Sequence, residues 1–165
     1  MSESNYSTRP AHKMDVHAIA PFMRQQDVEE VRVSHGVTPH EALSIGLECS
    51  DTCRVGVSNG VPVVMYGVSP HTLLGENGTI WLLGTDEAAL NWKPFMRVYR
   101  EEISIITQGF KHVENWVDRR NTVSLRWLRW MGFSVEDTPQ PYGIYQMPFY
   151  HFTRDIETCA TSKSL

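Results

Sequence analysis

The sequence predicts an α/β (α+β) protein with a mixed, mostly antiparallel sheet of six to seven strands flanked by about four helices. Two observations predict it. The apolar periodicity changes along the chain in the order strand, two or so helices, three strands, helix, strand, helix and two strands. An Asn-Gly pair also joins two β-branched runs, which indicates a hairpin. We expect one domain over residues 1–154 and a flexible tail over residues 155–165.

Size and composition exclude several classes of protein. A chain of 165 residues with 41% hydrophobic and 21% charged residues can bury a core of its own. The net charge of −4 gives no basic face, so we expect no binding to nucleic acid. No apolar run approaches the ~20 residues that span a bilayer, so we expect a soluble protein that is not exported. Cys49 and Cys53 with His35 or His40 lack the second half of a zinc site, so we expect no metal.

The first part of the chain predicts one strand followed by helices. "YSTRPA" indicates a short edge strand, and "KMDVHAIAPFMR" indicates a helix that Asp15 can cap. "QDVEEVRVS" offers a further helical piece. The next helix has a clear beginning, because Thr38 can act as the cap, Pro39 suits the first helical position, and Glu41 completes a capping box.

The middle of the chain predicts three consecutive strands and a long helix. Asn59 and Gly60 separate two β-branched runs, and "TIWLLGT" is a continuous apolar run that suits a strand buried on both faces. The following segment repeats apolar residues at intervals of three or four, which predicts a helix facing the core. These residues are Phe95, Tyr99, Ile103, Ile106 and Phe110.

The last part predicts a strand at "HVENWVD", a helix over 121–131 and two further strands at "FSVE" and "IYQMPFYHFT". On that helix Thr122, Arg126 and Arg129 form one narrow polar stripe that we expect to face water. The remaining circumference is mostly apolar, so we expect the helix to be buried on most sides. Asn121 and Ser124 fall inside the apolar arc, where each polar group needs a partner.

The motif "N..S..WL..MGF" in this order of elements resembles the GNAT (Gcn5-related N-acetyltransferase) superfamily, over roughly residues 6–154. "WLLGTD", "NWVDRRNTVSLRWLRWMGF" and "YGIYQMPFYHF" together resemble a GNAT-like family of short-tailed bacteriophages, described as internal virion proteins or acetyltransferases. The resemblance implies a sheet that splays between strands 4 and 5. It also implies acetyl-CoA or another acyl-CoA as the cofactor in the gap.

The resemblance also assigns candidate cofactor-binding residues. The pantetheine arm would lie along the fourth strand by backbone hydrogen bonds, and the pyrophosphate would lie over the start of the next helix. Two basic residues on that helix could add positive charge, although the polar face of an amphipathic helix explains them equally well. Asn121 serves either as an N-cap or as a pantetheine ligand, and both roles are compatible. The candidates are Leu83, Gly84, Thr85, Lys93, Arg97, Asn121 and Ser124.

Two features depart from the family pattern. The glycine-rich phosphate loop is replaced by "DEAALNWKP", in which Asp86 and Glu87 place negative charge where an anion would bind. Leu128 occupies the position where many GNAT enzymes carry a tyrosine that protonates the leaving thiolate. A leucine cannot donate a proton, and such help is typically worth about 10²–10⁴ in rate. Tyr142, Tyr145 or Tyr150 could substitute from the last strands.

The candidate general bases are Glu114 and Asp86, which we expect near the strand ends that border the gap, although each also fits a surface carboxylate. Five tryptophans are more than a small core easily hides, so Arg126, Trp127, Arg129 and Trp130 would fit a protein contact. Ordinary core packing, with the Arg stems covering the rings, is the more common explanation. The sequence therefore favours a bacteriophage protein that acts mainly through contacts with phage or host proteins and can retain acyl-CoA. Its place would be the host cytoplasm or the virion. The alternative is an active N-acyltransferase for an amine of a host protein or small molecule.

Overall fold

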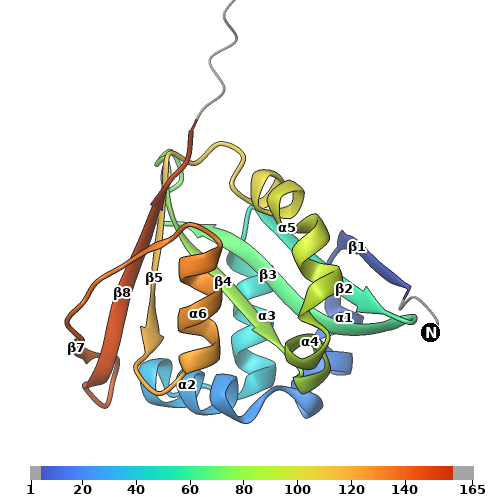
Figure 1. Ribbon diagram of the computed structural model, residues 1–165, viewed down its shortest axis with the longest axis horizontal. Coiled ribbons are helices and arrows are strands. Elements are labelled where there is room, and N and C mark those ends of the chain that lie inside the picture. The colour runs from blue at the N-terminus through green and yellow to red at the C-terminus, as the bar shows by residue number, and fades with distance from the viewer. Residues whose placement is uncertain (1–4, 158–165) are drawn as a thin grey trace, which may run out of the picture.

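The computed structural model describes residues 5–157, which form one curved sheet with helices on both faces (Figure 1). Within these residues the sheet has eight strands in the order β1-β2-β3-β4-β5-β8-β6, and β7 pairs with β8. The predicted fold class is confirmed. The short strand β7, which the sequence did not predict, raises the strand number above the six to seven expected.

The elements follow the predicted order, with the short helix α4 and the short strand β7 as additions. The chain runs through β1 (Tyr6–Pro10), α1 (Lys13–Ile19), the 3₁₀ helix η1 (Ala20–Phe22), α2 (Gln25–His35), α3 (Pro39–Cys49), β2 (Thr52–Ser58), β3 (Val61–Pro70), β4 (Asn77–Gly84), α4 (Asp86–Leu90), α5 (Trp92–Ile106), β5 (His112–Asp118), α6 (Thr122–Trp130), β6 (Ser134–Val135), β7 (Gln140–Tyr142) and β8 (Met147–Asp155). None of the helices between residues 5 and 157 is long and apolar enough to cross a membrane.

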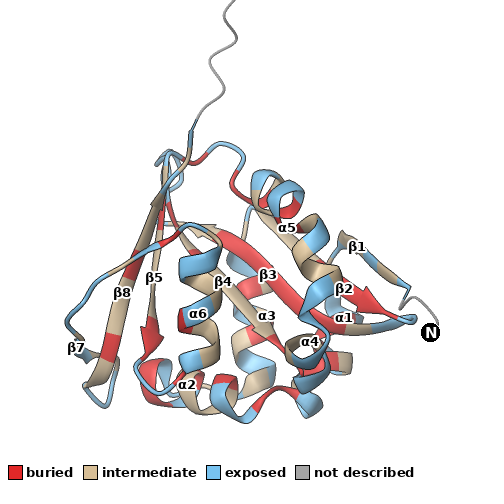
Figure 2. Cartoon of the chain, viewed as in Figure 1, coloured by how far each residue is buried: buried red, intermediate tan, exposed pale blue. Residues whose placement is uncertain are grey.

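The core is divided by the sheet into two layers (Figure 2). On one face Val16 and Ile19 of α1 and Leu43 of α3 pack against β2 and β3. On the other face Ile106 of α5 and Leu125 of α6 pack against β3, β4, β5 and β8. Burying an aliphatic side chain of this size stabilises the fold by about 1.5–3 kcal/mol, so both layers hold the sheet in shape.

The local signals of the sequence hold with one exception. Asn59 and Gly60 both have positive φ angles (48° and 81°) between β2 and β3, as a tight hairpin turn requires. Thr38 and Glu41 form both bonds of the predicted capping box. Asp15 was expected as the cap of α1, but His12 holds that position. Asp15 lies three residues further on, where its carboxylate accepts from the His12 N–H at 2.9 Å and from Arg9.

β4 and β5 lie parallel and pair only at their beginnings. Asn77–Thr79 pairs with His112–Glu114, and the Asn115 side chain then donates to the Ile80 carbonyl at 2.8 Å. Beyond that point no pair joins the two strands in the described part of the chain. They diverge toward their carboxyl ends, as Figure 1 shows. The predicted splay is therefore present.

Helix α6 covers the open end of the splay, and its burial differs from the prediction. Thr122, Arg126 and Arg129 face water as expected. Only Leu125 of the helix is fully buried, whereas Trp130 is 56% exposed. The apolar arc was expected to be buried on most sides. Trp127, Leu128 and Met131 are half-buried because they border a cavity, whereas Trp130 lies at the surface beside Tyr99. β8 continues to Asp155, and the rest of the predicted tail, from residue 158, lies outside the described residues.

Candidate functional site

A cavity of about 440 Å³ passes through the gap between β4 and β5. Its walls come from both faces of the sheet: His35 and Ile45 line it on the side of α2 and α3, and Phe95, Ile103 and Met131 line it on the side of α5 and α6. A volume of this size falls within the ~300–1,000 Å³ of small-molecule sites. The cavity is the candidate functional site.

The edge of β4 that faces the gap carries one free peptide group. The Asn115 side chain binds the Ile80 carbonyl, and the Arg24 N–H donates to the Gly84 carbonyl at 2.9 Å. Ile80 and Gly84 thus turn their peptide groups toward β5, and Leu82, midway between them, does the same because peptide directions alternate along a strand. No hydrogen-bond partner within residues 5–157 meets the Leu82 N–H or C=O on this side. An extended ligand could bind both.

The beginning of α2 closes the far end of the gap with a buried ion pair. Arg24 and Asp27 are 5% and 3% exposed, and their closest N–O distance is 2.6 Å. Asp27 also accepts from the Gly84 N–H at 3.1 Å, and Arg24 donates to the Ser124 hydroxyl at 3.2 Å. The Arg24 guanidinium lies 5.9 Å from the centre of the Trp127 ring. These contacts fix α2 to β4 and α6 together.

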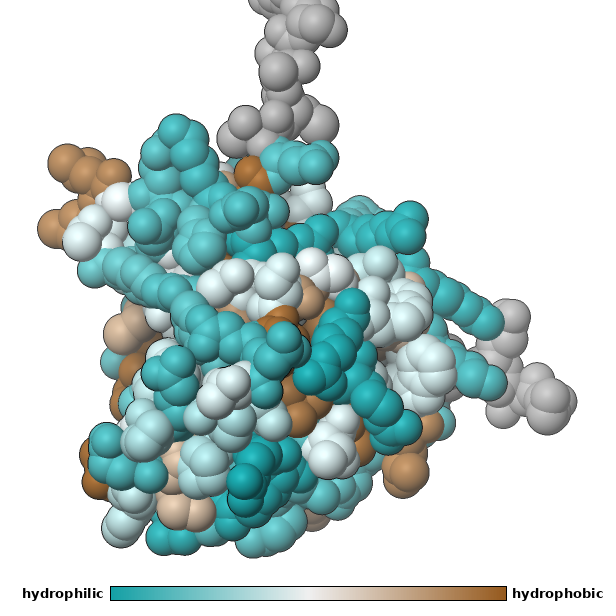
Figure 3. Space-filling model, turned by 60° about the vertical axis from the view of Figure 1, so that its left-hand side comes forward, coloured by the Kyte–Doolittle hydropathy of each residue, from teal (hydrophilic) through white to brown (hydrophobic). Residues whose placement is uncertain are grey.

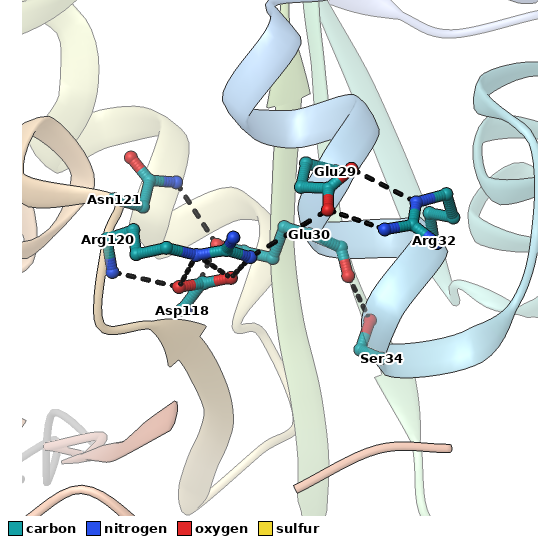
Figure 4. Close-up of polar contacts among 7 residues, drawn as sticks. All are labelled: Glu29, Glu30, Arg32, Ser34, Asp118, Arg120 and Asn121. Atoms are coloured by element: carbon teal, nitrogen blue, oxygen red, sulfur yellow. Dashed lines mark hydrogen bonds and ion pairs between the residues drawn. The ribbon is translucent and has the colours of Figure 1, made fainter. Parts of the chain in front are cut away.

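Glu30 of α2 lies inside the cavity at the carboxyl end of β5 (Figure 4). Its Oε2 atom accepts from the Asp118 N–H and from Asn121 Nδ2, each at 3.1 Å. The neighbouring Asp118 carboxylate is neutralised by a bidentate contact with Arg120, with a shortest distance of 2.6 Å. Glu30 has no basic partner of this kind among the described residues.

The environment of Glu30 changes its acidity. Burial raises the pKa of Glu30 to about 7, and the negative charge of Asp27 acts in the same direction, while the hydrogen bond from Asn121 opposes both. A carboxyl group with a pKa near neutrality can both take up and release a proton at physiological pH. Glu30 is therefore the acid–base candidate of the cavity.

Asn121 and Ser124 lie together at the edge of the site, but their polar groups are already engaged. Asn121 is buried and caps α6, because its side-chain oxygen accepts from the Ser124 N–H at 3.3 Å. Its amide nitrogen donates to Glu30, and the Ser124 hydroxyl accepts from Arg24. The side-chain oxygen of Asn121 therefore acts as the N-cap of α6. A pantetheine contact for either residue stays a prediction.

The three predicted backbone ligands of β4 differ in what they can offer. The Leu83 peptide faces β3 in register with Met65, and the Thr85 N–H donates to the Val63 carbonyl at 2.9 Å. The Gly84 peptide faces the gap but is bonded to Asp27 and to the Arg24 N–H. Leu82, which the sequence interpretation did not single out, has the free groups. Every second residue of "TIWLLGT" turns its N–H and C=O to the same side of the strand. Once the pairing with β3 was known, this alternation could have identified Leu82.

The charged residues that the sequence suggested as site residues do not lie together in the structure. Lys93 and Arg97 are exposed on α5, and Asp86 is exposed at the start of α4, where it lines neither the main cavity nor the small one beside Arg24. Glu114 does line the main cavity, and its carboxylate contacts His151 Nε2 at 2.8 Å. Of the two predicted bases, only Glu114 lies at the site. Glu30 was missed because nothing in "QDVEEVRVS" separates it from the neighbouring Glu29.

The wall on the α2 and α3 side is aromatic. Tyr142 of β7 stacks on Trp116 of β5 with ring centres 4.7 Å apart and planes 12° apart, and both line the cavity. Burial and the nearby Glu30 raise the pKa of Tyr142, so its hydroxyl holds its proton at neutral pH. The other two candidate tyrosines lie elsewhere: Tyr145 is exposed beside Arg32, and Tyr150 packs with the core behind α6.

The described residues contain no group of three or more His, Cys, Asp or Glu side chains placed to hold a metal ion.

Comparisons with known proteins identify the fold. No known family profile matches the sequence, and no curated protein matches it. Solved structures do match. Ard1 from Thermoplasma volcanium has a TM-score of 0.69 at 15% identity over 93% of this chain and 99% of that chain. An N-acetyltransferase from Staphylococcus aureus Mu50 has a TM-score of 0.68 at 15% identity over 93% and 100%.

A third similar structure, yncA from Salmonella typhimurium, is described as an acetyltransferase with its cofactor acetyl-CoA. It has a TM-score of 0.63 at 14% identity over 97% of this chain and 99% of that chain. At such low identities the likeness concerns the fold alone. The chain has the GNAT fold, with its sheet open between β4 and β5.

Proposed function

We propose that this protein is an N-acyltransferase that moves an acyl group from an acyl-CoA thioester to an amine. One observation supports it above the others: Glu30 lies in the same cavity, in the β4–β5 gap, that the free peptide group of Leu82 faces. A base and an unpaired backbone edge in one cavity are what acyl transfer to an amine requires.

The pantetheine end of an acyl-CoA fits this gap, whereas the pyrophosphate has no prepared site. The Leu82 N–H and C=O can pair with an extended chain of amide groups. At α4, by contrast, Asp86 and Glu87 are exposed and no glycine permits close approach of the backbone. We expect the free energy of binding to come from the pantetheine and acyl parts, with little from the phosphates.

The bound cofactor supplies an activated acyl group as a thioester. Glu30, ionised above pH 7, takes the proton from the acceptor amine as its nitrogen bonds to the acyl carbon. As the carbon–sulfur bond of the thioester breaks, the Tyr142 hydroxyl, which is protonated at neutral pH, would supply a proton to the departing sulfur. Tyr142 thus takes the role of the helix tyrosine that Leu128 replaces. The Asp118 N–H and Asn121 hold the Glu30 carboxyl in position.

The test combines binding and turnover. Calorimetry with acetyl-CoA measures binding, and release of free thiol in the presence of a panel of amines measures transfer. We expect Glu30→Gln to lower the transfer rate by about 10²–10⁴ while thioester binding persists. Glu29→Gln is the matched control, because Glu29 is the adjacent residue of α2 and pairs with Arg32 outside the cavity. Absence of binding by every acyl-CoA tested, or equal rates in both variants, contradicts the proposal.

A second function, binding to another protein, is favoured by the surface of α6. Trp130 is 56% exposed, and Arg126 and Arg129 beside it are also exposed. Tryptophan and arginine are the residues that most often dominate protein interfaces. Figure 3 shows that polar side chains break the apolar surface of one face into small areas. A virion role for such a contact stays a prediction of the sequence resemblance, which a search for this polypeptide in purified phage particles would test.

A further inference from the structure

We propose that the acyl group accepted by this site is a chain of medium length, longer than acetyl, lying in the apolar end of the cavity. This inference rests on the proposed function and names its acyl substrate.

The part of the cavity on the α5 and α6 side is lined by hydrocarbon, and we call it the apolar chamber. Three of its residues, Ile106, Phe133 and Phe152, are buried side chains of the core, and the other three are half-buried because they border the empty space. The chamber is lined by Ile103, Ile106, Leu128, Met131, Phe133 and Phe152.

The polar atoms nearest to the chamber are already engaged in hydrogen bonds within the protein. The Tyr66 hydroxyl donates to Glu102 at 2.7 Å, and the Glu102 carboxylate also accepts from Arg54 and Thr8. The Asn115 side chain donates to the Ile80 carbonyl and accepts from the Trp116 N–H at 2.8 Å. A chamber lined by hydrocarbon, whose nearest polar groups are already paired, holds water poorly and takes apolar ligands readily. An apolar occupant is therefore favoured.

The size of the cavity exceeds what an acetyl group needs. A dry cavity of about 150 Å³ in another protein binds benzene, whereas here the volume is about 440 Å³. Part of this volume lies on the α2 and α3 side of the sheet, and the pantetheine arm along Leu82 takes a further part, so the chamber suits a chain of intermediate length. Leu128 also contributes to this fit, since a tyrosine at that position would place a hydroxyl in the wall.

The chamber is continuous with the reacting groups, because its six residues and Glu30 line one cavity. A thioester held along the Leu82 edge of β4 can therefore turn its chain toward α5 and α6. The acyl carbon then stays near Glu30 and the aromatic wall of Trp116 and Tyr142. The chain length that fills the chamber determines which acyl group is preferred.

The test measures the affinity for acetyl-, butyryl-, hexanoyl- and octanoyl-CoA by calorimetry, which needs no acceptor and no turnover. Each buried methylene contributes about 0.8 kcal/mol, so the dissociation constant should fall by up to about fourfold per added methylene until the chamber is full. An affinity that does not change with chain length, with CoA still bound, overturns the inference and leaves the proposed function standing.

Substitutions in the chamber test whether the dependence of affinity on chain length arises there. Ile103→Trp fills the chamber and should bring the affinity ratio between octanoyl-CoA and acetyl-CoA toward one, and Met131→Phe serves the same purpose if the first variant fails to fold. Leu73→Trp is the control, because Leu73 is fully exposed in the β3–β4 loop, and it should keep the ratio of the unchanged protein. A ratio that survives both chamber variants contradicts the proposal.

A failure of CoA binding can be told apart from a failure of the chamber. If no CoA thioester binds, acetyl- and octanoyl-pantetheine, which lack the pyrophosphate, are compared by thermal shift. Stabilisation by the octanoyl compound alone then supports the chamber while the CoA-dependent function fails. No stabilisation by either overturns both.

Discussion

Asn121 Nδ2 donates a hydrogen bond of 3.1 Å to Glu30 Oε2, joining the first turn of α6 to the middle of α2. The same asparagine caps α6 through its oxygen. One amide therefore fixes both the start of a helix and the orientation of the carboxyl group in the cavity. Figure 4 shows the bond from Asn121 to Glu30. Because the bond stabilises the ionised form, it also keeps the pKa of Glu30 from rising further.

Glu30 should make the protein less stable as the pH rises through the neutral range. Burial raises its pKa from 4.5 to about 7, so the folded state binds more protons than the unfolded state between these values. The free energy of unfolding should therefore fall between about pH 4.5 and pH 7 and change little above. Glu30→Gln should remove this slope and add on the order of 2 kcal/mol at pH 8. Urea unfolding at pH 5 and pH 8 measures this change in the free energy of unfolding. An unchanged slope in the variant contradicts the assignment of the pH dependence to Glu30.

Two substitutions of Asn121 should differ in their pH dependence. Asn121→Ala removes the cap and should cost about 1 kcal/mol at both pH 5 and pH 8. Asn121→Asp keeps a good cap but places a second carboxylate against Glu30. This variant should be close to the unchanged protein at pH 5 and clearly less stable at pH 8. Thermal unfolding at the two pH values measures both, and identical profiles would show that the side chain acts only as a cap.

Proline substitutions at two adjacent positions of β4 should distinguish the role of the free N–H group from that of the paired one. The Leu82 N–H faces the gap without a partner in the described chain, whereas the Leu83 peptide faces β3. Leu82→Pro should fold with lowered stability and lose thioester binding, because proline has no N–H. Leu83→Pro removes a ladder hydrogen bond and should unfold the domain. Circular dichroism and calorimetry measure the two, and retained binding in Leu82→Pro would exclude the backbone contact.

The Arg24–Asp27 pair should matter more to stability than an exposed pair on the same helix. Arg24→Ala leaves the buried Asp27 carboxylate without its cation, which should cost about 3–5 kcal/mol. Arg32→Ala breaks the pair with Glu29 at the surface and should have little effect. Chemical unfolding of the two variants side by side measures the difference, and similar midpoints would contradict it.

The sequence by itself determined what depends on near neighbours along the chain. The Asn59-Gly60 turn, the Thr38 capping box and the polar stripe of α6 follow from local backbone geometry and a helical repeat, and the structure confirms all three. The order of elements and the motif opening at Asn121 were enough to predict the fold. The cap of α1 was misplaced because Asp15 suits either the cap or the third position, and only the accepted hydrogen bond decides between them.

The tertiary structure decided which groups meet at the gap. Glu30 and Asn121 are 91 residues apart in the chain, and Arg24 and Ser124 are 100 apart. No local pattern marks such pairs, because the pairing arises from how α2 packs across the ends of β4 and β5. The pKa of Glu30, the free edge at Leu82 and the cavity depend on burial and on strand separation. These properties belong to the packed chain, since they come from what surrounds a residue and not from its neighbours in sequence.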